Sequence, residues 1–388
     1  MNIFMDRYNL TLYRSWFPYL STGMVWMNHA AVSPLSSRAS DAVQNYLRRC
    51  QEDEIDTFFS TLPVAAKTKT NLGRLIGAPP ERIAFSGNTS DGLALLASGL
   101  SWKTGDRIIL NDSEFPANVV PFLNLKRLGV EIDFIETHQG EITPDQIEKL
   151  ITPRTKLVSL SFVQFLSGFR ADLEAVGRLC KMHGIIFCVD AIQGLGAFPI
   201  NVARMKIDFL ACGGPKWLMG LLGLGFIYVS DEMQERIHQS YAGWMSNKDY
   251  FGEFFNYRTD FDPTARRYEN GTQNLVGIVA LSESTTTLLE VGIEHIGAHL
   301  FELTDKIIAA ADDAGFDIIT PRDRNKRAGI VTFKCANGEE LFSSLKKENF
   351  IVSLREGFIR VSPHFYNSLH EVETLHGLLL RNKKMVGV

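Results

Sequence analysis

The stretch from residue 208 to 230, DFLACGGPKWLMGLLGLGFIYVS, follows shortly after GIIFCVD at 184–190, and these two segments decide the fold. Both contain continuous apolar runs, which are typical of strands buried on both faces of a sheet. Lys216 stands between two apolar runs, next to glycine and proline. A buried ammonium is costly unless it is neutralised, paired or used covalently. The position of Lys216 therefore indicates a chemical role, with an ordinary loop lysine as the alternative.

Similar apolar runs recur through the first 230 residues and alternate with helical patterns. The seven expected strands cover 82–87, 106–112, 130–137, 156–163, 184–190, 208–214 and 223–230. The helical patterns between them cover 91–100, 117–129 and 171–184. This alternation predicts an α/β fold with a mostly parallel sheet. Ligands in such folds bind outside the carboxyl ends of the strands, so residues that follow these strands are expected to converge on one rim. They are Ser90, Phe115, Asp190 and Lys216.

The pattern changes after about residue 270. Residues 273–315 are expected to form one or two long helices. Short strands and a last helix follow, at 329–335, 350–356, 358–363 and from His370 onward. We therefore predict a large α/β domain over 21–269 and a smaller α+β domain over 270–388, with residues 1–20 packing on the smaller domain.

Composition narrows the class of protein. The chain has 388 residues, a net charge of −4 and a pI near 6.2, so it carries no basic surface for nucleic acid. No apolar run reaches the roughly 18 residues of a membrane span, and residues 1–10 do not resemble a signal peptide. Five cysteines without CxxC spacing predict reduced thiols, a cytoplasmic location and no zinc or other metal site.

Lys216 and Asp190 together suggest a specific cofactor. A desolvated lysine amine loses its proton and can form a Schiff base with an aldehyde. Asp190 would supply the anion that pyridoxal 5'-phosphate needs opposite its ring nitrogen. Taken singly, Lys216 is equally explained as a loop lysine and Asp190 as a helix cap.

Phosphate binding is expected within SGNTSDG, residues 86–92, where a strand gives way to a helix. Backbone N–H groups at a helix N-terminus form a phosphate site together with nearby hydroxyl and amide side chains. The candidates are Asn88, Thr89 and Ser90. Plain capping of the helix by these residues is the alternative.

Further candidates lie near other strand ends. Phe115 could stack on a pyridine ring, although a core phenylalanine is the simpler explanation. Gln164 and Gln193 could each bond a phenolic oxygen, and Gln193 could instead cap a helix. Arg355 and Arg360 could hold a substrate carboxylate bidentately, with a surface ion pair as the alternative for either.

The spacing of VDAIQ (189–193) to GGPKW (213–217) resembles the class V branch of fold-type I pyridoxal-phosphate enzymes. The likeness extends from NHAAVSP (28–34) to SPHFYNSLHEVE (362–373). This family includes cysteine desulfurases, selenocysteine lyases, kynureninases, isopenicillin N epimerase-like proteins and class V aminotransferases. The resemblance implies a fold-type I transferase fold with a central, mostly parallel seven-stranded sheet and a smaller α+β domain. It also implies a homodimer with active sites at the interface.

The resemblance assigns roles to matching residues. Lys216 is similar to the Schiff-base lysine and Asp190 to the partner of the pyridinium nitrogen. Gln193 matches the residue near the phenolic oxygen, and Gln164 takes the place of a desulfurase asparagine. Phe115 falls where relatives keep a stacking histidine or phenylalanine. The phosphate loop is matched by Thr89 and Ser90.

Three further matches concern the phosphate and the substrate. Trp244, in AGWMS, resembles a kynureninase tryptophan that touches a phosphate. Thr272, in ENGTQN, resembles a threonine that reaches the phosphate bound in the neighbouring subunit. Arg360 matches the arginine that holds the substrate carboxylate, whereas Arg355 has no such match.

The chain departs from the desulfurases in ways that matter. Gly213 and Pro215 stand where desulfurases have a serine and a histidine. Between Arg355 and Arg360 there is no room for the loop that carries the desulfurase cysteine, and Cys335 is expected to be a buried core thiol. Cysteine desulfuration is therefore disfavoured, because persulfide chemistry needs a mobile thiolate.

The expected function is that of a pyridoxal-phosphate enzyme acting on an α-amino acid, with an amino acid and a keto acid as substrates. A class V aminotransferase, a transferase, is the first choice. An epimerase (an isomerase) or a lyase of the isopenicillin N epimerase or kynureninase type is the alternative. A catalytically inactive cofactor-binding scaffold is the non-enzyme alternative. A dinucleotide-dependent dehydrogenase is rejected because GLLGLG, at 220–225, lacks the required glycine order.

Overall fold

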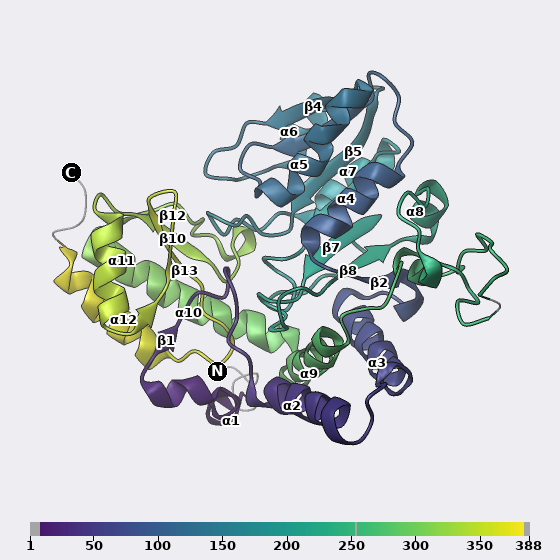
Figure 1. The fold of residues 1–388 in the computed structure, drawn as a ribbon. Helices are drawn as coiled ribbons and strands as arrows, with labels where there is room; N and C mark the ends of the chain where they lie inside the picture. The colour runs from purple at the N-terminus through teal and green to yellow at the C-terminus, as the bar shows by residue number, and fades with distance from the viewer. Residues whose placement is uncertain (1–7, 253, 384–388) are drawn as a thin grey trace.

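A seven-stranded sheet forms the centre of the larger part of the molecule in this computed structural model, which describes residues 8–252 and 254–383 (Figure 1). Its strands are β2 (Ile83–Ser86), β3 (Arg107–Asn111), β4 (Glu131–Ile135), β5 (Thr155–Ser161), β6 (Ile186–Asp190), β7 (Phe209–Gly213) and β8 (Gly225–Val229). The spatial order is β2-β8-β7-β6-β5-β3-β4, and among these strands β8 alone runs in the direction opposite to the other six. All seven expected strands are present, and the predicted mostly parallel α/β fold is confirmed.

The apolar runs of the central strands are explained by burial on both sides. In β6, Phe187 and Val189 belong to one hydrophobic cluster, whereas Ile186 and Cys188 belong to a second. Successive side chains of a strand point to opposite faces, so the two clusters lie on the two faces of the sheet. A strand covered on both faces has no solvent side, and the sequence shows no alternation there.

Helices surround this sheet. They are α2 (Ser37–Glu52), α3 (Phe58–Ile76), α4 (Thr89–Gly99), α5 (Val120–Leu123), α6 (Pro144–Leu150), α7 (Leu173–Met182) and α8 (Asp231–Arg236). Helix α4 packs on β7 and β8, and α7 packs on β6. The helical pattern at 117–129 becomes only the four-residue α5, between 3₁₀ turns at Pro116–Asn118 and Asn124–Leu128. Pro121 has no N–H to donate, and this favours a broken segment over a continuous helix.

The C-terminal part combines helices with a small sheet. Its elements are α9 (Leu275–Val291), α10 (Ile293–Ala314), β9 (Asp317–Ile318), β10 (Val331–Lys334), α11 (Gly338–Lys347), β11 (Phe350–Ile351), β12 (Ser353–Arg355), β13 (Phe358–Val361) and α12 (Leu369–Arg381). Four of the strands form an antiparallel sheet in the order β12-β13-β10-β9. Strand β11 pairs in parallel with β1 (Val25–Trp26). The expected strands at 329–335 and 358–363 and the last helix are thus confirmed. The single strand expected at 350–356 is divided into β11 and β12, which belong to different sheets.

The long helical pattern at 273–315 is divided into two helices at Gly292. This residue has a φ of 87° and lies between α9 and α10, whose axes differ by 77°. Helix α10 packs on α12, whereas α9 packs on α2 and α3.

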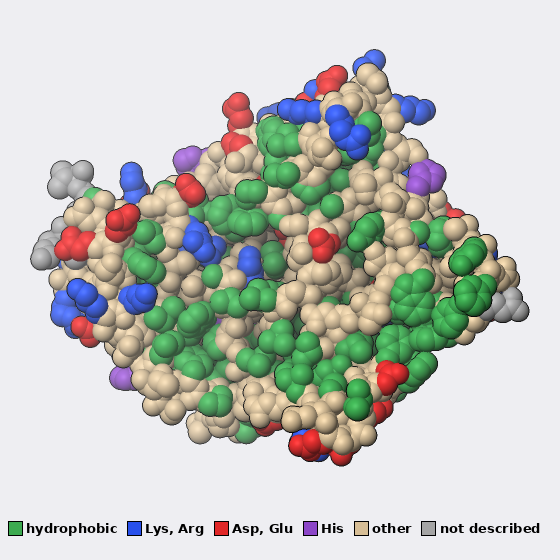
Figure 2. Space-filling model, viewed as in Figure 1, with side chains coloured by type: hydrophobic (Ala, Val, Ile, Leu, Met, Phe, Trp, Pro, Cys, Tyr) green, Lys and Arg blue, Asp and Glu red, His purple; other side chains and the backbone are tan. Residues whose placement is uncertain are grey.

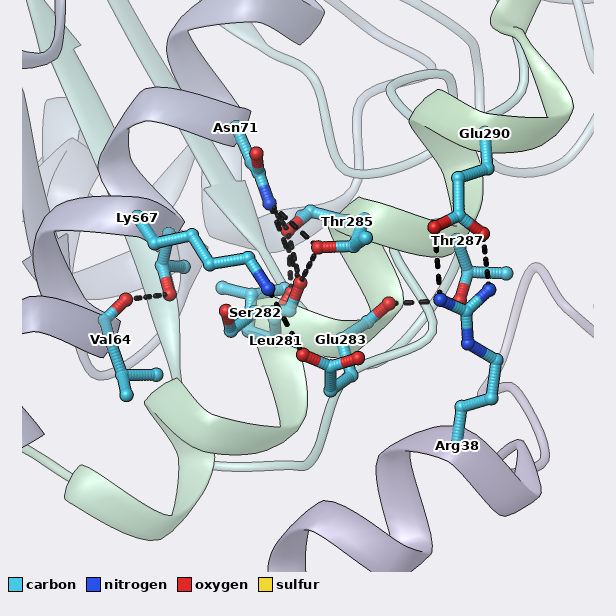
Figure 3. Close-up of polar contacts among 12 residues, drawn as sticks. Arg38, Val64, Lys67, Asn71, Leu281, Ser282, Glu283, Thr285, Thr287 and Glu290 are labelled. Atoms are coloured by element: carbon cyan, nitrogen blue, oxygen red, sulfur yellow. Dashed lines mark hydrogen bonds and ion pairs between the residues drawn. The ribbon is translucent and has the colours of Figure 1, made fainter.

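Polar contacts join α9 to α2 and α3, as Figure 3 shows. The Nδ2 of Asn71 donates to the hydroxyl of Thr285 at 3.2 Å. Lys67 pairs with Glu283 at 3.2 Å. Arg38 of α2 forms a bidentate ion pair with Glu290. The start of the C-terminal region is therefore attached to the helices of the N-terminal half.

The N-terminal segment contacts the C-terminal part. The Tyr8 hydroxyl donates to the carbonyl of Phe365. Arg14, in α1 (Leu10–Ser15), donates to the carbonyl of Tyr366 at 2.9 Å and pairs with Glu371 at 2.8 Å. These contacts are made by residues within 8–20, whereas residues 1–7 lie outside the described part of the chain. The packing of residues 1–20 on the smaller domain and the domain division at residue 270 stay predictions.

Among the described residues, no single helix has both the length and the apolar composition needed to cross a membrane. Helices α9 and α10 together would meet that test by length and composition, although they are bent by 77°.

Candidate active site

Three of the predicted residues lie at or just beyond the carboxyl ends of the parallel strands β3, β6 and β7. Asp190 is the last residue of β6, Lys216 follows β7 by three positions, and Phe115 lies beyond the end of β3. The Nζ of Lys216 lies 5.7 Å from the centroid of the Phe115 ring. The charges of Lys216 and Asp190 also influence each other's pKa. The expected convergence on one rim therefore holds for these three side chains.

Asp190 is buried, since the whole residue is only 2% exposed. Its pKa is raised to about 7, chiefly by burial and to a lesser degree by the charge of Glu114. A hydrogen bond from the N–H of Ile192, at 3.0 Å, and the charge of Lys216 act in the opposite direction. A carboxyl in this state is suited to share a proton with a basic ring nitrogen.

The surroundings of Lys216 lower the pKa of its amine and so favour the neutral form. Its pKa is lowered to about 8, chiefly by burial and to a lesser degree by the charges of Arg360 and Arg355. Asp190 opposes this effect. Because only the neutral amine is a nucleophile, Lys216 is more reactive near neutral pH than an ordinary lysine.

Both ends of the chain hold the backbone around Lys216. Ser33 donates its N–H to the carbonyl of Pro215 at 2.8 Å and its hydroxyl to the carbonyl of Lys216. The Nε2 of His364 lies 3.1 Å from the carbonyl oxygen of Trp217. Three successive carbonyls are thus fixed, and the lysine side chain starts from a rigid backbone.

The amide of Gln193 has a fixed orientation. Its Oε1 accepts a hydrogen bond from the indole N–H of Trp217 at 3.0 Å, and its Nε2 donates to the carbonyl of Ala30 at 2.9 Å. No helix lies between β6 and β7, so the alternative of helix capping does not apply. The second Nε2 proton is left for another acceptor.

A buried carboxylate that the sequence reasoning missed, Glu114, orients Gln164. It accepts hydrogen bonds from Gln164 Nε2 at 3.1 Å, Asn111 Nδ2 at 2.6 Å and the N–H of Ser161 at 2.7 Å. The Oε1 of Gln164 is buried and has no hydrogen-bond partner among the described residues. An orphaned buried acceptor fits a ligand that brings a hydroxyl donor. Its position in SEFP, directly before Phe115, was the available signal for Glu114.

The residues at the start of α4 have different roles. Asn88 is the N-cap, since its side chain accepts from the N–H of Asp91, so the capping alternative describes this side chain. Thr89 is buried and its Oγ1 accepts from the N–H of Gly213 at 2.9 Å. Ser90 is exposed. The Thr89 contact places the helix start beside the end of β7, three residues before Lys216.

Arg360 is buried without an acidic partner. Its Nε donates to the Ser353 hydroxyl at 3.1 Å and one terminal nitrogen donates to the carbonyl of Phe165 at 2.7 Å. Within the described chain no carboxylate pairs with it, so the alternative of a surface ion pair does not apply. Burial lowers its pKa to about 10. A buried, unneutralised guanidinium is suited to bind an incoming carboxylate.

Two predicted residues are not joined to this cluster by the contacts of the chain. Trp244 is half-exposed and contacts the rings of Tyr250 and Phe251. Thr272 is exposed in the segment before α9. Their roles in binding the phosphate stay predictions.

The residues present fit pyridoxal 5'-phosphate. A buried carboxyl, an amine of lowered pKa and an aromatic ring lie together. Gln164, with its orphaned Oε1, follows β5, and the N-terminus of α4 contacts the end of β7 through Thr89. These groups match the ring nitrogen, the aldehyde, the ring face, the phenolic group and the phosphate, in that order.

Comparison with known proteins agrees with this arrangement. The family described as Aminotransferase class-V matches residues 25–375. An uncharacterized aminotransferase, YcbU of Bacillus subtilis, is 26% identical over 93% of this chain and 94% of its own length. A probable cysteine desulfurase of Pyrococcus abyssi is 31% identical over 78% of this chain and 79% of its own. Isopenicillin N epimerase of Streptomyces clavuligerus is 25% identical over 92% of this chain and 94% of its own length.

Solved structures give the same result. A cysteine desulfurase from Thermococcus onnurineus has a TM-score of 0.87 and 26% identity, and the match covers 96% of this chain and 97% of that one. The cystine C-S lyase C-DES, at 20% identity, has a TM-score of 0.88 and shares the fold over 96% of this chain and 100% of its own. With the family match over most of its length, this chain belongs to the aminotransferase class-V family.

Proposed function

We propose that the protein is a pyridoxal-phosphate enzyme that acts on an α-amino acid, and that the reaction is transamination. Pyridoxal 5'-phosphate is the cofactor, in accordance with the fold-type I family. One observation carries the proposal. Lys216, with its pKa lowered to about 8, lies within electrostatic reach of both the buried Asp190 and the buried, carboxylate-free Arg360.

Each residue has a distinct task in this proposal. Lys216 would hold the cofactor through Nζ, and Asp190 would keep the proton on its ring nitrogen. Phe115 would cover one face of the ring, and Gln193 would offer its remaining Nε2 proton to the phenolic oxygen. Thr89 and the N–H groups at the start of α4 would bind the phosphate, with Ser90 beside them. When bound, the cofactor supplies an electron-withdrawing ring that accepts the electron pair released at the substrate Cα.

The chain's own residues orient the substrate and move its proton. Arg360 would bind the α-carboxylate with its two terminal nitrogens. Lys216, once its amine is released, would take the proton from Cα and return it elsewhere on the same face. The ionisable neighbours that shift the pKa of Lys216 are Asp190, Arg360, Cys212 and Arg355. Asp190 is assigned to the ring nitrogen, burial raises the pKa of the Cys212 thiol well above its usual range, and the arginines are cations, so none of them is a base suited to act at Cα. One base favours transamination over an epimerisation that uses two.

Cysteine desulfuration has less support, although several relatives are described as probable cysteine desulfurases. Arg355 pairs directly with Phe358 in the β12–β13 hairpin, and Glu356 and Gly357 form a two-residue turn, so no long loop is inserted. Burial raises the pKa of the Cys335 thiol. A buried, protonated thiol is a poor acceptor of persulfide sulfur.

The proposed protein is a homodimer. Trp244 and Thr272 are exposed in this chain, and in the family both kinds of residue serve a phosphate, Thr272 that of the neighbouring subunit. Exposed aromatic side chains surround Trp244, which supports a subunit contact there. The five cysteines, which lack CxxC spacing, fit a reducing compartment, and we propose the cytoplasm.

The test is incubation of purified protein and cofactor with amino acids and a keto acid. Transamination transfers the amino group, so a new amino acid appears and the cofactor changes to its amine form. Lys216→Ala should abolish turnover, at least about 10³-fold, because it removes both the attachment point and the base. The control Lys206→Ala changes an exposed lysine in the loop before β7 and should leave turnover unchanged.

Other products identify the alternatives. Racemised amino acid without amino transfer would support an epimerase, and release of ammonia or a side-chain fragment would support a lyase. Protein that binds the cofactor at Lys216 but turns over none of the amino acids would indicate a binding scaffold.

A further inference from the structure

One face of the β12–β13 hairpin carries two arginines. Residues paired directly across an antiparallel hairpin have side chains on the same face. Ser353 pairs with Arg360 and Arg355 pairs with Phe358, so these four side chains share a face. The intervening Leu354 belongs to the opposite face. That face packs against α11, whose Gly338 would bring a Cβ within 3.0 Å of Leu354.

The arginine face points toward the candidate active site. Arg360, at its inner end, donates to the carbonyl of Phe165, and the Phe165 ring contacts Phe115 at a centroid distance of 5.4 Å. Phe115 in turn lies against Lys216 Nζ. Arg355 belongs to the next residue pair on this face, which is nearer to the hairpin turn than the pair that contains Arg360, and Arg355 is exposed. It therefore lies at the rim of the same site.

Arg355 has no acidic partner. The structure gives its side chain no hydrogen bond and no ion pair within residues 8–252 and 254–383. Its charge lowers the pKa of both Arg360 and Lys216, so it is close enough to act on each. Cations that face one another without an anion repel, and this repulsion is relieved when an anion binds between them.

The backbone fixes the position of Arg355. Glu356 and Gly357 have φ angles of 48° and 80°, the geometry of a tight two-residue hairpin turn. Arg355 is thus the last strand residue before the turn rather than part of a long loop. The adjacent Glu356 makes no ion pair with it, which argues against a simple local charge pair.

We propose that Arg355 selects the substrate by binding a second anionic group, carried by the side chain of the amino acid. This inference rests on the proposed function, in which Arg360 binds the α-carboxylate. The substrate class is then an acidic amino acid, with carboxylates at both ends. The guanidinium fork of Arg355 recognises the distal carboxylate bidentately, and the Phe115 and Phe165 rings pack on the methylenes between the two anions.

A binding experiment tests this without relying on turnover. Glutarate carries two carboxylates and butyrate carries one on a similar chain, so their dissociation constants for the cofactor-loaded protein are compared by calorimetry. We expect glutarate to bind at least about tenfold more tightly than butyrate. Arg355→Leu should weaken glutarate about tenfold and leave butyrate within about twofold, and Arg355→Lys should restore part of the glutarate affinity. Arg381→Leu removes an exposed arginine of α12 and is the matched control.

Kinetics provide the second readout. In the wild type, kcat/KM for glutamate should exceed that for the uncharged isostere glutamine, and Arg355→Leu should remove this preference through KM. Equal affinity for glutarate and butyrate in the wild type, or equal losses for both in Arg355→Leu, would overturn the assignment. If no amino acid is turned over but glutarate still binds in an Arg355-dependent way, the proposed reaction fails and the second anion site stands.

Discussion

Lys216 owes its reactivity to where its amine is held. Burial lowers its pKa from 10.5 to about 8, so the neutral fraction rises as the pH increases through 8 rather than through 10.5. The neutral amine attacks the aldehyde, and we therefore predict that the rate of cofactor attachment to the apo-protein rises with pH and levels off above about pH 9. Stopped-flow absorbance of the bound cofactor measures this rate.

Arg355 and Arg360 both lower the Lys216 pKa, so the midpoint responds to their charge. Arg355→Leu should move the midpoint of the attachment rate to higher pH. A rate that keeps rising to pH 10.5 in the wild type would contradict the burial of this amine.

Trp217 determines which end of the Gln193 amide faces which partner. An indole N–H only donates, so it holds the Gln193 oxygen and leaves the nitrogen as the donor for a phenolic oxygen. We predict that Trp217→Phe weakens cofactor binding about fivefold, the value of one neutral hydrogen bond. Trp102→Phe removes an indole bond to the carbonyl of Ala97 and is the control.

Titration of apo-protein with cofactor gives both dissociation constants. A positioning role also requires the visible absorbance of bound cofactor to change its pH midpoint in Trp217→Phe but not in Trp102→Phe. An unchanged spectrum together with a lowered melting temperature would mean that Trp217 serves packing alone.

The sequence predicts the residues that react with the cofactor better than it predicts the residues that position them. Asp190 and Lys216 are predictable because each ends a buried run with an ionisable group. Trp217 and Glu114 act through Gln193 and Gln164, and the hydrogen bonds by which they do so join residues 24 and 50 positions apart. No local pattern encodes such pairs, so only the fold reveals them.

At the level of elements, periodicity identifies strands more reliably than helix continuity. All seven central strands were predictable because burial on both faces leaves an uninterrupted apolar run. The helix expected at 117–129 was wrong as a continuous element, since its apolar spacing does not reveal what Pro116 and Pro121 do to the backbone. The 273–315 pattern left the number of helices open because one glycine, Gly292, decides it.

Gly292 lets the chain turn between α9 and α10. Its φ of 87° and ψ of 124° lie where residues with a Cβ are strained. We predict that Gly292→Ala lowers the free energy of unfolding by about 1–3 kcal/mol, measured by denaturant unfolding. Gly184 has a φ of 66°, in the ordinary left-handed region, and a Cβ there meets no atom within 4 Å. Gly184→Ala should therefore cost only about 1 kcal/mol, and an equal loss in both variants would contradict the strain at Gly292.

On the scale of the whole molecule, one surface is unusually apolar. Figure 2 shows hydrophobic side chains gathered along the side where α3 and the loop after α8 lie in Figure 1. Ring contacts join the exposed Phe59, Trp244, Phe251 and Phe254 into one group, and the exposed Phe255 and Tyr257 follow Phe254 in the same loop. A single soluble chain rarely leaves so many large apolar side chains in water. We name this set the aromatic surface, and in the proposed homodimer it contacts the second subunit.

The aromatic surface gives the dimer a direct test. Phe255 and Tyr257 are 88% and 87% exposed, so changing both to aspartate leaves the core of the subunit intact but places charge in the contact. We predict that wild-type protein has twice the 43.5 kDa chain mass by light scattering, and that the double variant dissociates at least tenfold more readily. Met182→Asp changes an apolar residue at the end of α7 that is 74% exposed, and this variant should remain dimeric. Because Thr272 is proposed to reach the phosphate of the neighbouring subunit, the monomeric variant should also lose cofactor affinity, and a monomer with full affinity would refute a shared site.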